Sequence, residues 1–118
     1  MQIRNSITLI GHVGQNPEVI NDKNGNEFVR FSLATNDTYT DRDGKRIKNT
    51  EWHTIMVFGK QVEYIKNNVT KGEMLAVSGM LRYRNWTDKL EQKRTSAAIH
   101  LETYSFLTAK KEMSETAA

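Results

Sequence analysis

The residues best suited to acid–base or metal chemistry are three histidines, and their spacing assembles no site. The three lie in separate segments, at His12, His53 and His100. No two of them have the short spacing that places two metal ligands on one face of a helix. The chain has no cysteine, which excludes disulfides and thiolate zinc sites. We therefore predict no catalytic residue, no metal and no cofactor.

Acidic residues offer no better site. Glu51 and His53 share one face of a predicted strand and are a candidate acid–base pair, although a histidine bonded to a neighbouring strand or at a subunit contact is the commoner arrangement. Asp41-Arg42-Asp43-Gly44 resembles the start of a calcium loop, but the later acids of such a loop are absent and basic residues follow. A solvated hairpin tip explains this segment better.

Aromatic residues give a more specific pattern. The segment TEWHTIMVFGK, residues 50–60, alternates between two faces if it is a strand. His53, Ile55 and Val57 lie on one face, which predicts an ordinary buried side. The other face carries Trp52, Thr54, Met56 and Phe58. This second face is either buried as well or an exposed surface that contacts something flat and apolar.

Two further aromatics lie in polar, basic stretches. Tyr39 falls within residues 36–49, and Trp86 follows Arg82 and Arg84 with the same parity. Residues 82–94 hold five basic residues against two acids. One such ring alone is more often part of the core. Rings interleaved with cations suit a single-stranded nucleic acid, because its phosphates need positive charge and its unpaired bases can stack.

The elements that position these residues are mostly strands. Period-two patterns predict strands over 3–13, 27–35, 50–60, 74–84 and 97–106. Asn24-Gly25 predicts a hairpin turn, and residues 36–49 and 84–95 read as polar hairpin loops. In residues 60–72, Val62, Ile65 and Val69 have helical spacing, and Gly72 is well placed to end that helix.

Five strands with one short helix between the third and the fourth predict an all-β fold. Gly11 and Gly79 lie inside strands, where glycine relieves crowding at barrel corners. A five-stranded Greek-key barrel with this helix is the OB-fold. The alternative is an open sheet with the helix on one face. We expect a single domain over residues 1–108 and a short, disordered polar tail over residues 109–118.

The chain resembles the bacterial single-stranded DNA-binding proteins. The resemblance rests on NSITLIGHVGQNPEV (5–19), FSLATN (31–36), TEWHTIMVFGK (50–60) and KGEMLAVSGMLRYRNWTD (71–88), and on their spacing. It implies an OB-fold that assembles as a homotetramer, or as a dimer, and coats single strands during replication, repair and recombination. The positive net charge of +3 agrees with an anionic partner but decides nothing alone.

The resemblance also implies roles for individual residues. The stacking aromatics of the family match Trp52, Phe58 and Trp86, and Tyr39 stands where the family often has tryptophan. The basic DNA contacts match Lys60, Lys71 and Arg84, to which we add Arg4. His53 matches a residue at the subunit interface, and Asn85 stands where a basic residue is common.

The C-terminal residues differ from the family pattern. Family members continue into a Gly/Pro-rich linker and an acidic tip that recruits other proteins, whereas this chain ends in KKEMSETAA. We therefore expect a tailless or truncated member, and partners recruited through a tail are not carried over. No segment resembles a signal peptide or a membrane span, so the expected location is the bacterial cytoplasm and nucleoid.

Three rival functions remain open at this point. A tailless OB-fold adaptor of replication restart or of a mobile element shares the fold and the DNA binding, and differs in oligomeric mass and site size. A small OB-barrel nuclease needs clustered acids for a metal, which the sequence lacks. An RNA chaperone uses the same stacking chemistry, because stacking does not distinguish the two sugars.

Overall fold

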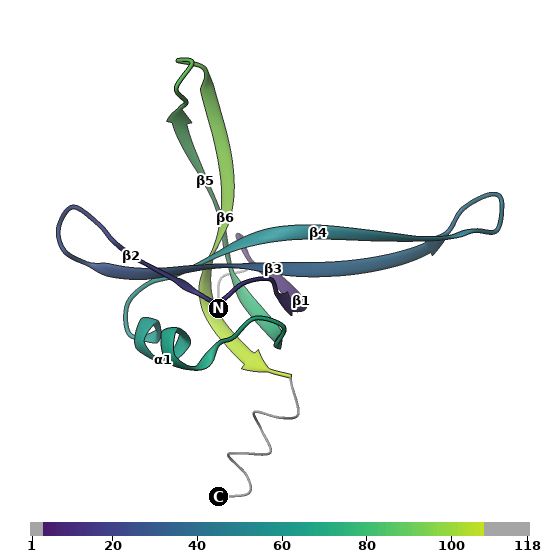
Figure 1. The fold of residues 1–118 in the computed structure, drawn as a ribbon, viewed down its shortest axis with the longest axis horizontal. Coiled ribbons are helices and arrows are strands. Elements are labelled where there is room, and N and C mark those ends of the chain that lie inside the picture. The colour runs from purple at the N-terminus through teal and green to yellow at the C-terminus, as the bar shows by residue number, and fades with distance from the viewer. Residues whose placement is uncertain (1–3, 108–118) are drawn as a thin grey trace, which may run out of the picture.

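The computed structural model describes residues 4–107, and Figure 1 shows its arrangement. Six strands and one helix follow in the order β1 (Ile7–Val13), β2 (Glu18–Asn21), β3 (Glu27–Thr40), β4 (Arg46–Val57), α1 (Gln61–Asn68), β5 (Met74–Thr87) and β6 (Lys93–Phe106). The predicted strands are all present, and β2 is an addition that pairs only with β3. The helix therefore lies between β4 and β5.

Five of the strands close into a barrel. The sheet runs β1-β5-β6-β4-β3-β2, and β1 also pairs with β3, which joins the two ends of the sheet. All pairings are antiparallel except β4 with β6, where Ile55 lies opposite Ile99 in a parallel pair. This circuit with the helix after its third strand confirms the OB-fold prediction, and the open-sheet alternative is wrong.

Glycine is required where the strands cross closely. A side chain at Gly11 would collide with the backbone carbonyl of Ala34, and one at Gly79 would collide with that of His100. The strands can approach this closely only because neither residue has a Cβ atom. This agrees with the prediction that both glycines relieve crowding at barrel corners.

The barrel interior is apolar, and α1 contributes to it. The fully buried large side chains are Phe31, Leu33, Ile55, Ile65, Leu75, Val29, Val57, Val69 and Val77. The prediction that the helix runs on to Gly72 is wrong, because it ends at Asn68. Val69 already has an extended backbone and is buried in the core, so packing of this side chain takes the chain out of the helix.

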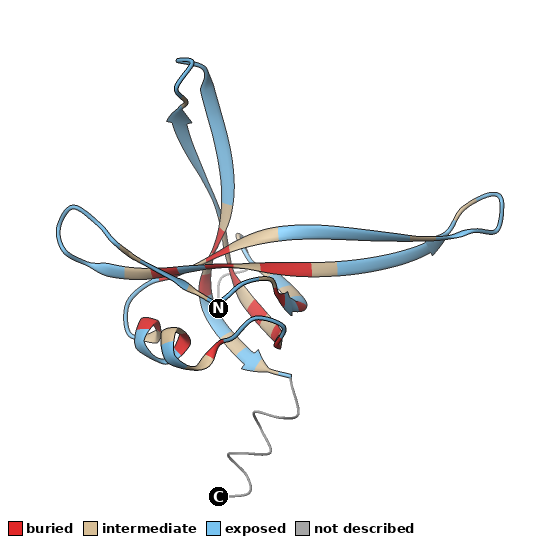
Figure 2. Cartoon of the chain, viewed as in Figure 1, coloured by how far each residue is buried: buried red, intermediate tan, exposed pale blue. Residues whose placement is uncertain are grey.

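Two hairpins continue beyond the barrel as exposed arms, which Figures 1 and 2 show extending to the right and upward. We call residues 36–50 the β3–β4 arm and residues 82–97 the β5–β6 arm. The prediction of long polar loops in these regions is wrong, since pairing continues to Thr40 with Arg46 and to Thr87 with Lys93. Threonine and aromatic residues favour strands even where no core covers them.

Three hairpins turn through loops of the same construction. Each five-residue loop, 22–26, 41–45 and 88–92, begins with an aspartate whose Oδ1 accepts two backbone N–H groups of the same loop. The fourth residue has a positive φ in all three loops. It is Gly25 (83°), Gly44 (81°) or Glu91 (63°). Only Glu91 has a side chain at this left-handed position, where a Cβ atom is unfavourable.

Candidate nucleic-acid interface

A groove of about 520 Å³ lies between the outer face of β3 and β4 and the base of the β5–β6 arm. Its lining residues are Arg30, Thr54, Met56, Arg82, Tyr83, Arg84, Ser96, Ala97, Ala98 and His100. The three β6 residues 96–98 are small, which leaves room between the two hairpins. We call this the arginine groove, because its lining has three arginines and no carboxylate.

The arginines differ in how far they are neutralised. Arg30 donates to Glu18 Oε1 at 2.6 Å, and both side chains are about half exposed. Within residues 4–107, Arg82 and Arg84 form no ion pair. Their charges are therefore available to an anion in the groove. Of these, sequence reasoning assigned only Arg84, although the matching parity of Arg82 was a usable signal.

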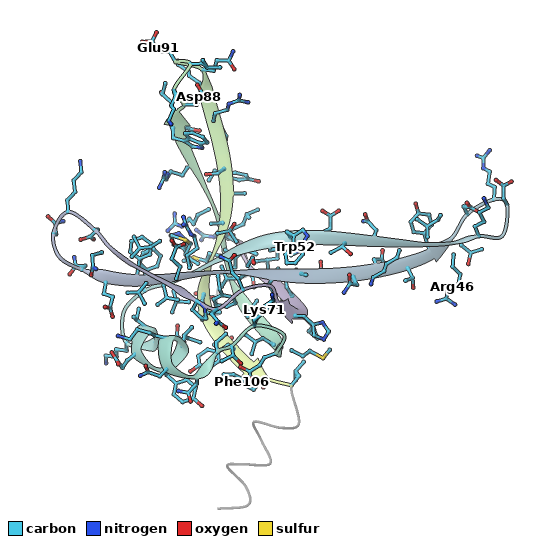
Figure 3. All side chains as sticks on the ribbon, in the orientation of Figure 1. Arg46, Trp52, Lys71, Asp88, Glu91 and Phe106 are labelled. Carbon is cyan, nitrogen blue, oxygen red and sulfur yellow. The ribbon has the colours of Figure 1, made fainter. Side chains whose placement is uncertain are left out.

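Trp52 is the most exposed of the predicted stacking residues, at 63%. It lies on β4 near the crossing of the two hairpins (Figure 3). Its six-membered ring packs against Gly14, where a Cβ atom would collide with Cζ3. The ring thus has one supported side and remains largely open. Trp52 also lines a smaller groove of about 120 Å³ with His53, Leu81 and Ile99.

Phe58 is less open than the sequence suggests. It is 45% exposed, but its ring stacks on Phe28 at 5.2 Å between centroids and meets the His100 ring at 4.9 Å. Phe28, Phe58 and His100 therefore form a series of three rings beside the arginine groove. Sequence reasoning missed the other two rings. Phe28 shares the outward parity of Arg30 and was recognisable for that reason.

Trp86 lies apart from these rings on the β5–β6 arm. It is 43% exposed and lines a third groove of about 420 Å³ together with Lys93 and Arg94. Arg94 donates through Nε to Asp88 Oδ2 at 2.9 Å, so part of the positive charge at this end is already neutralised. Backbone hydrogen bonds, chiefly with Gln92, and the Arg94 contact hold the pKa of Asp88 below its usual value.

Tyr39 is not on the same surface as Trp52. Along the β3–β4 ladder, Trp52 pairs with Ala34 and Tyr39 pairs with Ile47. Because faces alternate along a strand, the two aromatics project from opposite faces of the ribbon. Tyr39 is 55% exposed. A nucleic-acid strand that contacts both Trp52 and Tyr39 must therefore pass around an edge of the β3–β4 arm.

The remaining predicted basic contacts lie outside these three grooves. Arg4, Lys60 and Lys71 are all exposed. The backbone N–H of Lys71 donates to Asn16 Oδ1 at 2.8 Å. The backbone of Lys71 is thereby joined to the segment that follows Gly14.

His53 and the acidic residues form no catalytic arrangement. His53 Nε2 lies 2.9 Å from Thr35 Oγ1, and Glu51 accepts from Asn49, so the candidate acid–base pair is not made. Among residues 4–107 no group of three or more histidine, aspartate or glutamate side chains is placed to hold a metal. No helix in this part of the chain is long and apolar enough to cross a membrane.

The sequence matches a family model over residues 4–107, which is the whole of the described chain, and that model is the single-strand binding protein family. The chain belongs to this family. The resemblance inferred from four sequence segments is thereby confirmed.

Individual members of the single-strand binding protein family are similar to this chain along most of their length. Single-stranded DNA-binding protein 1 of Xylella fastidiosa is 37% identical over 109 residues, which cover 92% of this chain and 80% of that protein. A single-stranded DNA-binding protein of Rickettsia felis is 34% identical over 103 residues, which cover 86% of this chain and 68% of that protein.

Solved structures of the family share the fold. The Plasmodium falciparum SSB in complex with ssDNA superposes with a TM-score of 0.80 at 32% identity, covering 91% of this chain and 97% of that chain. A mutant of the single-stranded DNA binding protein from Thermus aquaticus gives a TM-score of 0.76 at 26% identity, and the match covers 90% of this chain and 51% of that chain.

Proposed function

We propose that this protein binds and protects single-stranded DNA without sequence preference during replication, repair and recombination. The observation that carries the proposal is the arginine groove, which combines three guanidinium groups, no carboxylate and exposed rings beside it. Phosphates are held by the cations, while unpaired bases stack on the rings. A duplex offers no base faces to such a surface, so it binds more weakly.

The proposed contacts divide into two kinds. Bases stack on Trp52, Trp86 and Tyr39, and on the ring series that contains Phe58. Phosphates contact Arg84 together with Lys60, Lys71 and Arg4. Arg82 joins this second set, because it lines the same groove as Arg84 and forms no ion pair among the described residues.

Intrinsic tryptophan fluorescence tests the proposal directly, because both tryptophans are among the proposed contacts. We expect poly-dT to quench the emission strongly and a duplex of equal length to leave it nearly unchanged, at two salt concentrations. The saturation point gives the number of nucleotides held per protein. Equal responses to the single strand and the duplex would contradict the proposal.

We further propose that the protein acts as a homo-oligomer, most simply a tetramer, with His53 near a subunit contact. Within residues 4–107, β1 pairs with β5 along one edge, and no strand pairs with its other edge from Ile7 to Gly11. Ile10 on this strand is 54% exposed. Sedimentation with and without dT oligomers tests this. A dimer with a small site size would favour the rival function, a protein-docking adaptor of replication restart or of a mobile element.

The protein is proposed to have no enzymatic activity and to work in the bacterial cytoplasm and nucleoid, because its relatives are single-stranded DNA-binding proteins. A magnesium-dependent cleavage assay on single-stranded DNA tests the first point. Titration with poly-rU alongside poly-dT tests whether RNA is a partner. Residues 109–118, for which we predicted a disordered tail, lie outside the described residues.

A further inference from the structure

His100 ends the ring series and also lines the arginine groove, and the proposed contacts give its imidazole no role that depends on its charge. It lies on β6, opposite Met56 of β4 and Met80 of β5. Its imidazole is partly buried and lies 4.9 Å from the Phe58 ring, at the end of the ring series. An imidazole can both stack on a base and, when protonated, pair with a phosphate.

The charges around His100 are almost all positive. Arg82 and Arg84 face the groove from β5, and Arg30 faces it from β3 with Glu18 of β2 as its ion-pair partner. The neighbouring side chains of Met56, on β4, and of Phe58, which follows the end of β4, carry no charge. On β6 itself the nearest acid is Glu102, which is exposed.

This environment favours the neutral imidazole when the groove is empty. Burial, followed by the charge of Arg82, lowers the pKa of His100 below its ordinary value of 6.5. A phosphate in the groove would act in the opposite direction, because it stabilises the imidazolium and offsets the guanidinium charge. Binding of an anion and binding of a proton at this position are therefore coupled.

We propose that His100 is a further DNA-contacting residue that takes up a proton when a single strand occupies the arginine groove. The inference rests on the proposed function and deepens it, since it makes the affinity for single-stranded DNA depend on pH. The protein then holds its strand more tightly in mildly acidic solution than in mildly alkaline solution.

The sign and size of the effect follow from linkage. Affinity is lowest above the pKa of His100 in the complex, rises as the pH falls through that value, and levels off below the pKa of His100 in the free protein. The total gain is about tenfold in affinity for each unit by which the two pKa values differ.

The test measures the affinity for a dT oligomer from pH 5.5 to 8.5 at constant ionic strength. Thymine is a suitable base because it does not titrate in this range. The variant is His100→Gln, which retains hydrogen-bonding capacity without the titration. The matched control is His12→Gln, because His12 is exposed on β1 and lines none of the three grooves. In parallel, NMR follows the imidazole of His100 in the unmodified protein, free and bound.

We expect the unmodified protein and His12→Gln to bind several-fold more tightly at the acidic end, and His100→Gln to lose this dependence. The NMR titration should move to higher pH on addition of dT. An unchanged pH dependence in His100→Gln, or a His100 titration that DNA does not move, would overturn the inference. Failure of dT to bind at any pH would instead contradict the proposed function. If His100→Gln fails to fold, the NMR titration alone decides the matter.

Discussion

At the scale of single residues, the proposed interface contains aromatic rings that are supported on one side and exposed on the other. Trp52 illustrates this, since its indole rests on Gly14 and yet 63% of the residue is exposed. A ring fixed on one side loses little conformational freedom when a base stacks on the other. Phe58 differs, because its contacts with Phe28 and His100 occupy much of its ring.

Replacing Trp52 with alanine should weaken binding of a dT oligomer by about 1–3 kcal/mol, the range for loss of one stacked base. The melting temperature should change little, because the side chain is mostly exposed. Isothermal titration and thermal unfolding check the two parts. Tyr64→Ala is the matched control, since Tyr64 lies on α1 within a separate aromatic cluster with Tyr104, and its removal should leave the affinity unchanged. A large drop in melting temperature with unchanged affinity would identify Trp52 as a core residue.

Gly14→Ala should weaken binding by moving the Trp52 ring. The new methyl group would collide with the indole and lie 2.8 Å from Ser32 Oγ, so the ring must shift. We expect a change in tryptophan emission and a loss of affinity smaller than that of Trp52→Ala. In the Trp52→Ala background, Gly14→Ala should have no further effect on affinity. Equal losses in both backgrounds would mean that Gly14 acts independently of the ring.

At the scale of elements, the three hairpin loops differ at their fourth residue, which is glycine in two loops and glutamate in the third. Gly25 and Gly44 adopt positive φ without cost, whereas Glu91 adopts it with a Cβ atom. The Asp88 carboxylate accepts backbone N–H groups at 2.9 Å from Leu90 and Gln92, which holds the loop in this shape. The β5–β6 arm therefore contains a local strain that the other two hairpins lack.

Glu91→Gly should stabilise the protein by about 1 kcal/mol, which is the cost of a left-handed backbone for a residue other than glycine. Denaturant unfolding measures the gain. The reciprocal control is Gly44→Ala at the equivalent position of the β3–β4 arm, which should destabilise by a similar amount. No gain in Glu91→Gly alongside a loss in Gly44→Ala would show that Glu91 makes compensating interactions.

How far the sequence predicts this fold differs between the barrel and its arms. The alternation of side chains identified Ile55 and Val57 as core residues, because a strand buried on one face has an apolar residue at every second position. The same rule fails in residues 36–49, where most side chains on both faces are exposed and polar and only Tyr39 and Ile47 are large and apolar, so no periodicity marks the strands. What extends the ladder there is cross-strand pairing, such as the 2.7 Å hydrogen bond from Thr50 Oγ1 to Asn36 Oδ1, which only the fold reveals.

The candidate site was predictable by residue type and less so by position. Stretches of aromatic and basic residues indicated Trp52, Trp86 and Arg84. Their distribution over three grooves depends on strand pairing and on the crossing of the two hairpins. Phe58, just after β4, contacts His100 of β6 because the two strands pair in parallel, and no local pattern in the sequence indicates such a pair.

At the scale of the whole molecule, binding should be governed by the number of phosphates neutralised. For a single strand, the logarithm of the affinity falls with the logarithm of the salt concentration, with a slope of about 0.7 for each contacted phosphate. Arg84→Gln should therefore flatten the slope by about this amount per subunit. Lys23→Gln, on the β2–β3 loop and outside the three grooves, is the matched control and should leave it unchanged. An unaltered slope in Arg84→Gln would remove this residue from the phosphate contacts.

The two arms leave the barrel in different directions, as Figure 1 shows. Under the proposed function, each arm would hold its own portion of a DNA strand. A strand bound in this way can leave in stages, with one arm vacant while the other still holds. A second strand that arrives during this interval can occupy the vacant arm and prevent the first from rebinding there. The lifetime of a complex should then shorten as the concentration of competing strands rises, although the equilibrium affinity stays the same. Two separate binding arms would thus let the protein bind DNA tightly and still pass rapidly from one DNA strand to another.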